Sequence, residues 1–504
     1  MALGAAQSVF FDLDRHQVPK ELVLHATALI GLMVMLPGWR RVQLTAIDGL
    51  LLLTLAWSWA SALLAVNHWI GFRAVSIGTS AFVVYLMARR IAGTPAARLA
   101  MAGLVAAVVI AATVGLAESF GFSHPIFATE RVPGGTFGNR NFLAHFVVIG
   151  LPLVGLMAVT SRRWWSVVAG VLAVVLMVGL IVITRSRAAW LAGLLSGGVL
   201  VLAAWGARAW RESLPRARRL GILLAAVTGG VAALIIPNQL EWKSESPYRD
   251  TVTGLVDFRT GSGQGRVLQW RNSLQLVPGD PVFGVGPGNW FVHYPRVTAP
   301  GDPAFAGYNA VPTNPWPSSD WVAFLTEVGV VGTVLLLLAG GAIGLTALRR
   351  TGSDDPAEVG RGLMVLGMMT AGLVTGGFDA VLHLAAPSFL LAAAVGLLVP
   401  ESGPVMDRPI RAAAARLAGG FAVVVVGLAL LLSAGHVAAL RATRDARDRA
   451  AVTTALRFAP GNHQLHLRLT QSGSCRARIA HARAAQSLLP FHPYPKRALR
   501  ECGG

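Results

Sequence analysis

Charged residues are scarce in this sequence. They make up 13% of its 504 residues, whereas 54% of the residues are apolar, and the mean hydropathy is +0.58. Soluble globular proteins carry about 25% charged residues. The composition therefore excludes an ordinary soluble enzyme, and the natural unit of the chain is the membrane span of about 20 apolar residues.

Several familiar catalytic and metal-binding patterns are also missing. Two cysteines exclude a disulfide-rich scaffold and a four-cysteine zinc site. No H-E-x-x-H or G-x-S-x-G pattern occurs, and the histidines are scattered, apart from His463 and His466, which are three residues apart and are expected to face solvent. The glycine-rich stretch 281–290 lacks the spacing of a nucleotide-binding loop. The sequence thus predicts no metal and no cofactor.

Long apolar runs fill most of the chain. The first run is preceded by acidic residues and is followed by no cleavage pattern, so we interpret it as a true span and not as a signal peptide. Twelve runs are long enough or nearly long enough to cross a bilayer. They lie near residues 22–38, 47–66, 71–88, 99–117, 142–160, 164–184, 188–206, 220–237, 320–347, 362–379, 386–400 and 414–435. The predicted fold is an all-α polytopic membrane protein.

Arginines indicate the orientation of these spans. One set of alternate short connections holds 18 arginines and the other set holds five. Because cationic loops stay in the cytoplasm, the first set is cytoplasmic. The net charge of +19 is then mostly a topological signal, and no nucleic-acid partner is implied. The predicted organisation is spans 1–8 in 1–237, a large periplasmic loop in 238–319, spans 9–12 in 320–435 and a tail in 436–504.

The tail has a helical pattern. Apolar and alanine positions recur at helical spacing in 450–458 and 477–489, separated by Pro460-Gly461-Asn462. This pattern predicts one or two helical hairpins of tetratricopeptide type. Span parity places the tail outside the cytoplasm, although it is strongly basic; one miscounted span, with 386–400 as the candidate, would reverse this. Cys475 and Cys502 form a disulfide if the tail is outside, or are two free buried thiols.

Five arginines remain in the short outward connections despite the charge bias, and the large outward loop holds others. The guanidinium group matches the oxygens of a phosphate, so several arginines converging on one face predict an anionic lipid head group as substrate. Outward segments that carry arginines are 134–142, 184–187 and 265–271. In the third segment, Arg266 and Trp270 share one face of a short amphipathic helix, and Arg271 lies beside that face.

These segments resemble the O-antigen ligase family of bacterial envelope enzymes, which includes O-antigen polymerases and protein O-oligosaccharyltransferases. The resemblance covers about residues 20–400. It implies a polytopic glycosyltransferase in the inner membrane with a large periplasmic loop over the active site. It also implies a polyprenyl-pyrophosphate glycan donor, inversion at the anomeric carbon and no metal. The motifs that carry it lie in 135–141, 184–187, 265–270, 284–289 and 320–329.

The resemblance assigns roles to individual residues. Arg187 and Arg266 match the family arginines that clamp the donor pyrophosphate, and Arg140 and Arg185 are further donor-binding candidates. Asn139 and Asn141 match the first motif, whereas Arg140 stands where the family often has proline. The substrate-loop candidates are Asn139, Asn141, Trp270 and Arg271.

One departure from the family concerns the catalytic base. Ser318 stands where the family usually has the histidine that activates the acceptor hydroxyl, and a serine hydroxyl is no base near neutral pH. Either Asp320 or His293 replaces it, or the acceptor differs, or the chain is not a transferase. Asp379, at the end of a span, is interpreted as an interfacial residue and not as a proton relay.

The resulting hypothesis is a glycan transferase that moves a glycan from a polyprenyl pyrophosphate to a hydroxyl acceptor at the periplasmic face. The acceptor is a lipid (lipid A-core), a growing glycan or a protein, corresponding to ligase, polymerase and protein glycosylation activities. A transporter or lipid-binding protein without catalysis is the alternative from another class. Such a protein favours ionisable or broken-helix sites at mid-membrane, and the sequence shows none.

Overall fold

The computed structural model describes residues 14–36, 41–122, 124, 131–242, 244–254, 259, 261–298, 302, 315–398, 406–409, 412–443 and 449–503, and these are predominantly helical. The first half contains α1 (Asp14–Met35), β1 (Arg41–Leu44), α2 (Ala46–Leu64), α3 (His68–Ile91), α4 (Pro95–Ser119), η2 (Gly135–Phe137), α5 (Arg140–Thr160), α6 (Trp164–Thr184), α7 (Arg187–Gly206), α8 (Arg208–Ser213) and α9 (Arg216–Ile235).

The second half begins with the short elements of the large loop. These are α10 (Pro247–Thr253), α11 (Gly261–Leu274), η3 (Val277–Gly279), α12 (Trp290–His293) and η4 (Tyr294–Arg296). The remaining elements are α13 (Asp320–Glu327), α14 (Gly329–Thr351), α15 (Pro356–Phe378), α16 (Ala385–Leu398), β2 (Met406–Pro409), α17 (Ala412–Ala442), α18 (Arg449–Phe458), α19 (His463–Leu469), α20 (Cys475–Leu488) and α21 (Pro493–Glu501).

The structure confirms an all-α polytopic membrane protein. Among the described residues, 11 helices are long and apolar enough to cross a membrane, and α16 is a shorter apolar helix. Large apolar side chains such as Leu202 and Leu224 point outward from α7 and α9, as expected for surfaces that face lipid. The run predicted as one span from residue 320 is divided in two, because the helix ends at Glu327 and α14 starts at Gly329.

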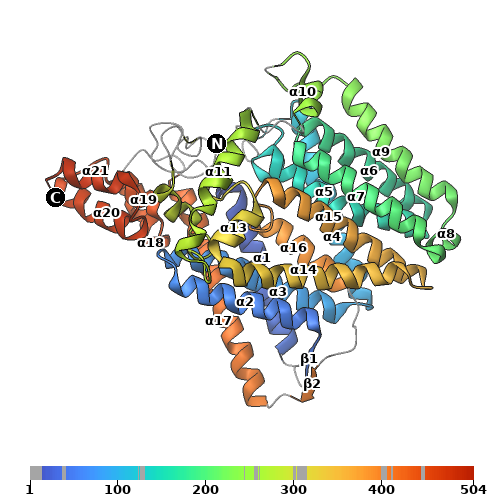
Figure 1. Cartoon of the computed structure of the whole chain (residues 1–504), viewed down its shortest axis with the longest axis horizontal. Helices are drawn as coiled ribbons and strands as arrows, with labels where there is room; N and C mark the ends of the chain where they lie inside the picture. The colour runs from blue at the N-terminus through green and yellow to red at the C-terminus, as the bar shows by residue number, and fades with distance from the viewer. Residues whose placement is uncertain are drawn as a thin grey trace.

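Helices α5 and α15 form the centre of the bundle. In the apolar stretches of α5 and α15, 78% and 67% of the residues are buried, whereas in those of α9 and α14 only 17% are buried. Helix α5 packs against α6 and α15, and α15 packs against α7 and α14. Figure 1 shows these helices running side by side, with α9 at one edge. The residues that follow α15 and precede α5 are therefore held by the most enclosed part of the fold.

A pair of short strands ties two connections together on one side of the bundle. Strand β1 pairs with β2 in antiparallel register, with Val42 opposite Arg408. Both connections were predicted to be cytoplasmic from their arginines, and their pairing places them on the same side. Helix α16 begins near Asp320 on the other side of the bundle and leads to β2, so it crosses the bundle despite its 14 residues.

The tail packs on the large loop. Leu276, Val285 and Phe291 of the loop share a buried cluster with Leu467 and Leu489 of the tail. Asn67, between α2 and α3, contacts both the loop and the tail. Its backbone N–H donates to the Asn289 side chain of the loop (2.8 Å), and its side chain donates to the Leu488 carbonyl of the tail (3.2 Å). The tail therefore lies on the same side as the loop, which we call the loop side. Figure 1 shows it as a group of short helices beyond the bundle.

The two cysteines of the tail are joined. Cys475, at the start of α20, and Cys502, at the end of α21, form a disulfide with a Cα–Cα distance of 5.3 Å. Of the two alternatives that the sequence left open, the structure shows the disulfide. The bond connects the last two helices of the tail, which also pack against each other.

Candidate active site

The first arginine segment is built around a helix start. Asn139 is the N-cap of α5, and its side-chain oxygen accepts a hydrogen bond from the Asn141 backbone N–H (2.9 Å). Such a cap satisfies one of the donors that a helix start leaves without a partner. It fixes Arg140 in the first turn of α5, on the loop side. Asn139 thus has a local structural role that positions Arg140.

Arg185 and Arg187 lie at the tight turn between α6 and α7. Arg185 ends α6 with a backbone φ of 53°, a left-handed conformation that costs a non-glycine residue about 1–2 kcal/mol. Its Nε donates to Thr251 Oγ1 (2.9 Å), and Arg187 donates to the Gly254 carbonyl (2.7 Å). Both arginines therefore hold α10 of the large loop. Strain of this kind persists where the surrounding contacts fix the backbone, and it is common at functional sites.

An indole ring joins two of these arginines. The guanidinium carbons of Arg140 and Arg185 lie 4.9 Å and 4.6 Å from the centroid of the Trp242 ring. A cation over an aromatic face is attracted by its quadrupole, so one ring holds two positive charges near each other. Arg131 also acts electrostatically on Arg140, and Arg187 acts on Arg185. Four cationic side chains thus gather on the loop side.

Arg266, on α11, extends this group. Its Nε is buried and makes no hydrogen bond, and its side chain forms no ion pair within the part of the chain that the structure describes. The charge of Arg266 acts on His145 of α5 and on Asp379, and Arg131 also acts on Asp379. We call Arg131, Arg140, Arg185, Arg187 and Arg266 the arginine cluster. All four arginines predicted to bind the donor belong to it.

The other two loop candidates on α11 are separated. The Trp270 indole N–H donates to the Ser318 carbonyl (3.1 Å), and its ring lies near Phe378. Trp270 therefore fixes the junction between α11 and α13. Arg271 is exposed to solvent. The substrate-loop roles of Trp270 and Arg271 stay predictions.

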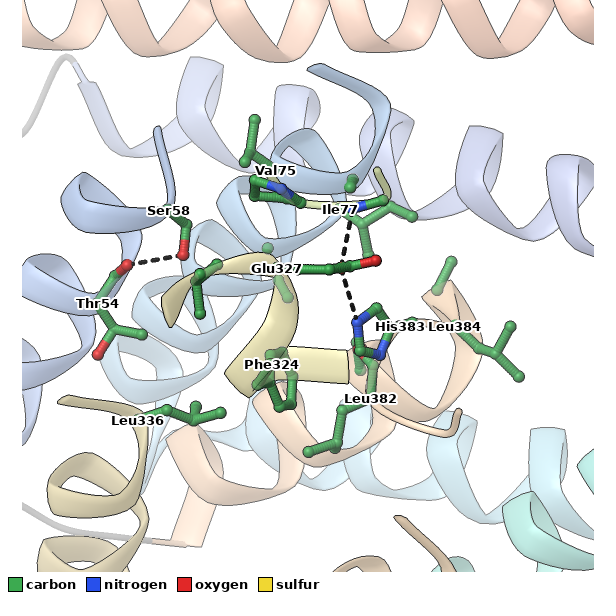
Figure 2. A pocket seen from close by; sticks show the side chains of 18 of the residues that line it. Thr54, Ser58, Val75, Ile77, Phe324, Glu327, Leu336, Leu382, His383 and Leu384 are labelled. Atoms are coloured by element: carbon green, nitrogen blue, oxygen red, sulfur yellow. Dashed lines mark hydrogen bonds and ion pairs between the residues drawn. The ribbon is translucent and has the colours of Figure 1, made fainter. Parts of the chain in front are cut away.

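Asp320 lies at a second polar centre, which the sequence did not reveal. Its Oδ2 accepts hydrogen bonds from the backbone N–H groups of Val381 and Leu382, both at 2.9 Å. Its Oδ1 lies 2.7 Å from His383 Nδ1, and His383 Nε2 lies 3.5 Å from a Glu327 carboxylate oxygen. Figure 2 shows His383 beside Glu327 and the ring of Phe324. We call Asp320, Glu327 and His383 the carboxylate–histidine group.

The electrostatics of this group keep the histidine charged. Burial alone would lower the pKa of His383, but its hydrogen bonds to the two carboxylates and their negative charges raise it to about 10. His383 is therefore an imidazolium at neutral pH, and it compensates two buried acids. His383 stands alone between Leu382 and Leu384 and belongs to no sequence motif. Its position in a connection on the same side as Asp320 was the only sign in the sequence of a contact between the two residues.

The glycine-rich stretch is part of the same centre. The N–H groups of Val285 and Gly286 donate to the carbonyls of Thr326 and Glu327, and the Gly288 N–H donates to the Glu327 carboxylate (2.8 Å). Gly286 has a φ of 97°, and a Cβ there would lie 2.3 Å from the Ala65 side chain. The glycines thus let this loop approach α2 and α13 closely. Its backbone amides bind a glutamate of the chain itself.

His293, the other candidate base, belongs to the boundary with the tail. Its ring lies 5.1 Å from the Phe491 ring, and its Nδ1 is 3.4 Å from Arg296. Burial lowers the pKa of His293 to about 4, and the charge of Arg296 acts in the same direction. The structure connects His293 with the tail, whereas Asp320 lies beside α15.

A large cavity adjoins the carboxylate–histidine group. It has a volume of about 930 Å³ and is lined mostly by apolar side chains of α2, α3, α14 and α16, with His383 and Glu327 in its wall. Trp316 also lines it and packs against Phe142, two residues after Arg140. The cavity and the arginine cluster are thus separated by few side chains. Figure 2 shows the apolar residues around His383.

One part of the chain matches a known protein family. Residues 172–337 match the family model described as O-antigen ligase, and no curated protein matches the chain. The matched region contains Arg185, Arg187, Arg266, the glycine-rich loop and the carboxylates of α13. It ends before Asp379 and His383. The resemblance predicted from the motifs is confirmed: the chain is a multi-pass membrane protein, and its residues 172–337 match the O-antigen ligase family.

Proposed function

We propose that the protein transfers a glycan from a polyprenyl-pyrophosphate donor to a hydroxyl acceptor at the periplasmic face of the inner membrane. The observation that carries this proposal is the arginine cluster. Its members come from four separate segments, and they meet on the loop side, opposite the arginine-rich connections that β1 and β2 join. The family match supports glycan transfer as the reaction class.

The chemistry of the cluster fits a pyrophosphate. A guanidinium group offers paired N–H donors to phosphate oxygens, and Arg266 is held without a hydrogen-bonding partner at its buried Nε. Such a cation is costly in the free protein and is compensated when an anion binds. As the bond from the sugar to the pyrophosphate breaks, negative charge grows on the leaving phosphate. Arginines fixed in place before the reaction stabilise that charge.

The apolar cavity supplies room for a hydrocarbon chain. Its volume lies at the upper end of the range for small-molecule sites, about 300–1,000 Å³, and its walls are transmembrane helices. Because Trp316 lines it and contacts the start of α5, a lipid chain in the cavity would lie near the arginine cluster. This arrangement favours substrates that are carried on lipids.

Replacement of two arginines tests this function. In cells that lack the gene, Arg266→Ala and Arg187→Ala variants should each restore less than about 1% of the glycan transfer of the wild type, because they remove donors to the developing charge. Arg249→Ala is the matched control: Arg249 is an exposed arginine of α10 and should restore full transfer. Normal transfer by both cluster variants, at normal protein levels, would disprove the proposal.

The glycan that stays on the lipid carrier identifies the acceptor. Full-length chains on the carrier of cells without the gene indicate a ligase, and single repeat units indicate a polymerase. A glycan missing only from proteins indicates an O-oligosaccharyltransferase. Mass spectrometry of the extracted carrier lipids and of envelope proteins separates the three activities.

A further inference from the structure

The transfer reaction needs a group that accepts the proton of the acceptor hydroxyl. Ser318 stands where the family usually has a histidine, and its side chain cannot fill that role near neutral pH. The Ser318 backbone is held by α11, because its N–H donates to the Gln269 side chain (2.9 Å) and its carbonyl accepts from Trp270. The position of Ser318 in the fold is thus well defined, and a neighbouring side chain must supply the base.

Asp320 is unsuited to this role. It is fully buried, and both carboxylate oxygens are occupied by Val381, Leu382 and His383. A fully buried carboxylate whose two oxygens both accept hydrogen bonds from the chain is not open to a substrate hydroxyl. Asp320 instead fixes the turn that leads from α15 to α16.

Asp379 lies at the start of this turn, in contact with the residues that follow Ser318. Its carbonyl accepts a hydrogen bond from the Asp320 N–H (3.1 Å), and Ser319 donates to the nearby Gly376 carbonyl. The Asp379 side chain is half-buried, and its Oδ1 accepts a hydrogen bond from the next residue, Ala380 (3.0 Å). Its other oxygen makes no hydrogen bond or ion pair to any described residue.

Charged groups from several elements face Asp379. Arg266 of α11 and Arg131, ahead of η2, attract it, and Asp320 of α13 repels it. Two histidines of this region are already engaged: His383 pairs with Asp320, and His145 of α5 lies near Arg266 and Ser186. No arginine of the described chain is within 4.0 Å of the Asp379 carboxylate, so it faces the arginine cluster without a direct ion pair. A substrate bound by Arg266 would lie next to this carboxylate.

We propose that Asp379 is the general base of the transfer reaction and replaces the histidine that this chain lacks. The proposal rests on the function proposed above. The acceptor oxygen forms a bond to the anomeric carbon and passes its proton to the Asp379 carboxylate. The bond between that carbon and the phosphate oxygen breaks, and the polyprenyl pyrophosphate leaves with the electron pair. Asp320 and His383 are positioning residues, because they hold the turn that carries Asp379.

The acidity of Asp379 suits this step. Burial raises its pKa to about 6, Arg266 and the Ala380 N–H act in the opposite direction, and Asp320 adds to the increase. At neutral pH the side chain is mostly ionised and can accept a proton, and it is a stronger base than an ordinary aspartate. The rate of transfer should therefore fall as the pH decreases through about 6.

Substitution of Asp379 tests this role. We would purify the full chain in lipid nanodiscs and measure transfer with membranes of gene-deleted cells as the source of donor and acceptor. Asp379→Asn keeps the oxygen that accepts from Ala380 and should lose at least about 100-fold in rate. Asp379→Glu should keep measurable transfer, with its acidic limb moved to a different pH. Asp354→Asn, which changes an exposed aspartate between α14 and α15, should transfer at the wild-type rate.

Binding of farnesyl pyrophosphate separates catalysis from structure. Asp379→Asn should bind this short donor analogue within about twofold of the wild type, whereas Arg266→Ala should lose binding. Transfer by Asp379→Asn above a tenth of the wild-type rate would overturn the proposal. Loss of farnesyl pyrophosphate binding in Asp379→Asn would also overturn it, in favour of a structural role. A wild-type protein that neither binds the analogue nor transfers glycan would instead refute the proposed function.

Discussion

Two polar centres lie on either side of the turn 379–383, and they differ in how their charges are compensated. In the carboxylate–histidine group, every carboxylate has a partner: Asp320 has two backbone N–H groups and His383, and Glu327 has the glycine-rich loop and His383. In the arginine cluster, the arginines act on one another, the charges of Asp250 and Asp379 also act within it, and the buried Nε of Arg266 has no acceptor. The charged groups of the first centre are thus paired with each other, whereas Arg266 in the second keeps a donor that an anion can satisfy.

This contrast assigns different consequences to mutations. A buried charge with fixed partners stabilises the fold, and removal of one partner leaves the others unpaired. A buried charge without a partner is kept for binding, and its removal costs the fold little. Mutations in the first centre should thus lower stability, and mutation of Arg266 in the second should lower activity at unchanged stability, whereas Arg185 and Arg187 also hold α10 through hydrogen bonds.

The largest effect on stability is expected for Asp320→Ala. It would leave the Nδ1–H of His383 and two backbone N–H groups without their acceptor in a buried site. Breaking a buried pair in this way costs about 3–5 kcal/mol. The apparent Tm of the purified protein, followed by intrinsic fluorescence, should fall by many degrees. A Tm within 2 °C of the wild type would show that this centre does not hold the fold.

The stability of the wild type should also depend on pH, through His383. The pKa of His383 is raised from its usual value near 6.5 to about 10 in the folded protein, so the protonated form stabilises the fold. That stabilisation is fully present below pH 6.5 and is lost as the pH rises to about 10. The apparent Tm of the wild type should therefore decrease between these values.

The matched control for this pH effect is His383→Gln. This variant should start from a lower Tm and show a flatter profile over the same range, because it has no proton to lose. Parallel profiles for the two proteins would indicate that other groups cause the decrease.

The number and orientation of the membrane spans could be predicted from the sequence, because a lipid bilayer restricts which residues can lie in spans and loops. Spans must be apolar and cytoplasmic loops attract arginine, so spans and orientation follow from local counts. The same rule drew attention to Arg140, Arg185 and Arg187, since arginines in the outward connections stand out against that bias, whereas the resemblance to the O-antigen ligase family selected Arg187 and Arg266 as donor-binding residues. The division between Glu327 and Gly329 was missed, because apolar residues continue across it.

The carboxylate–histidine group was not predictable in this way. Asp320 and His383 are 63 residues apart, and their contact depends on how α13 packs beside the end of α15. No local pattern records such a meeting, and a single histidine among leucines resembles any other interfacial histidine. Asp379 was recognised as a residue at a span end, but its contact with Asp320 became visible only in the fold.

The smallest effect on stability is expected for Arg266→Met, which keeps the length of the side chain and removes its charge. Arg73→Met is the matched comparison, because Arg73 is a half-buried arginine whose guanidinium forms ion pairs with Asp14 and Glu21, both at 2.8 Å. Loss of Arg73 would leave the buried Glu21 and the half-buried Asp14 unpaired and should lower the Tm strongly, whereas loss of Arg266 leaves no group without a partner. Arg266→Met should thus keep or raise the Tm and still lose binding of farnesyl pyrophosphate. If both variants lose Tm equally, Arg266 has a structural partner, and the distinction between the two centres fails.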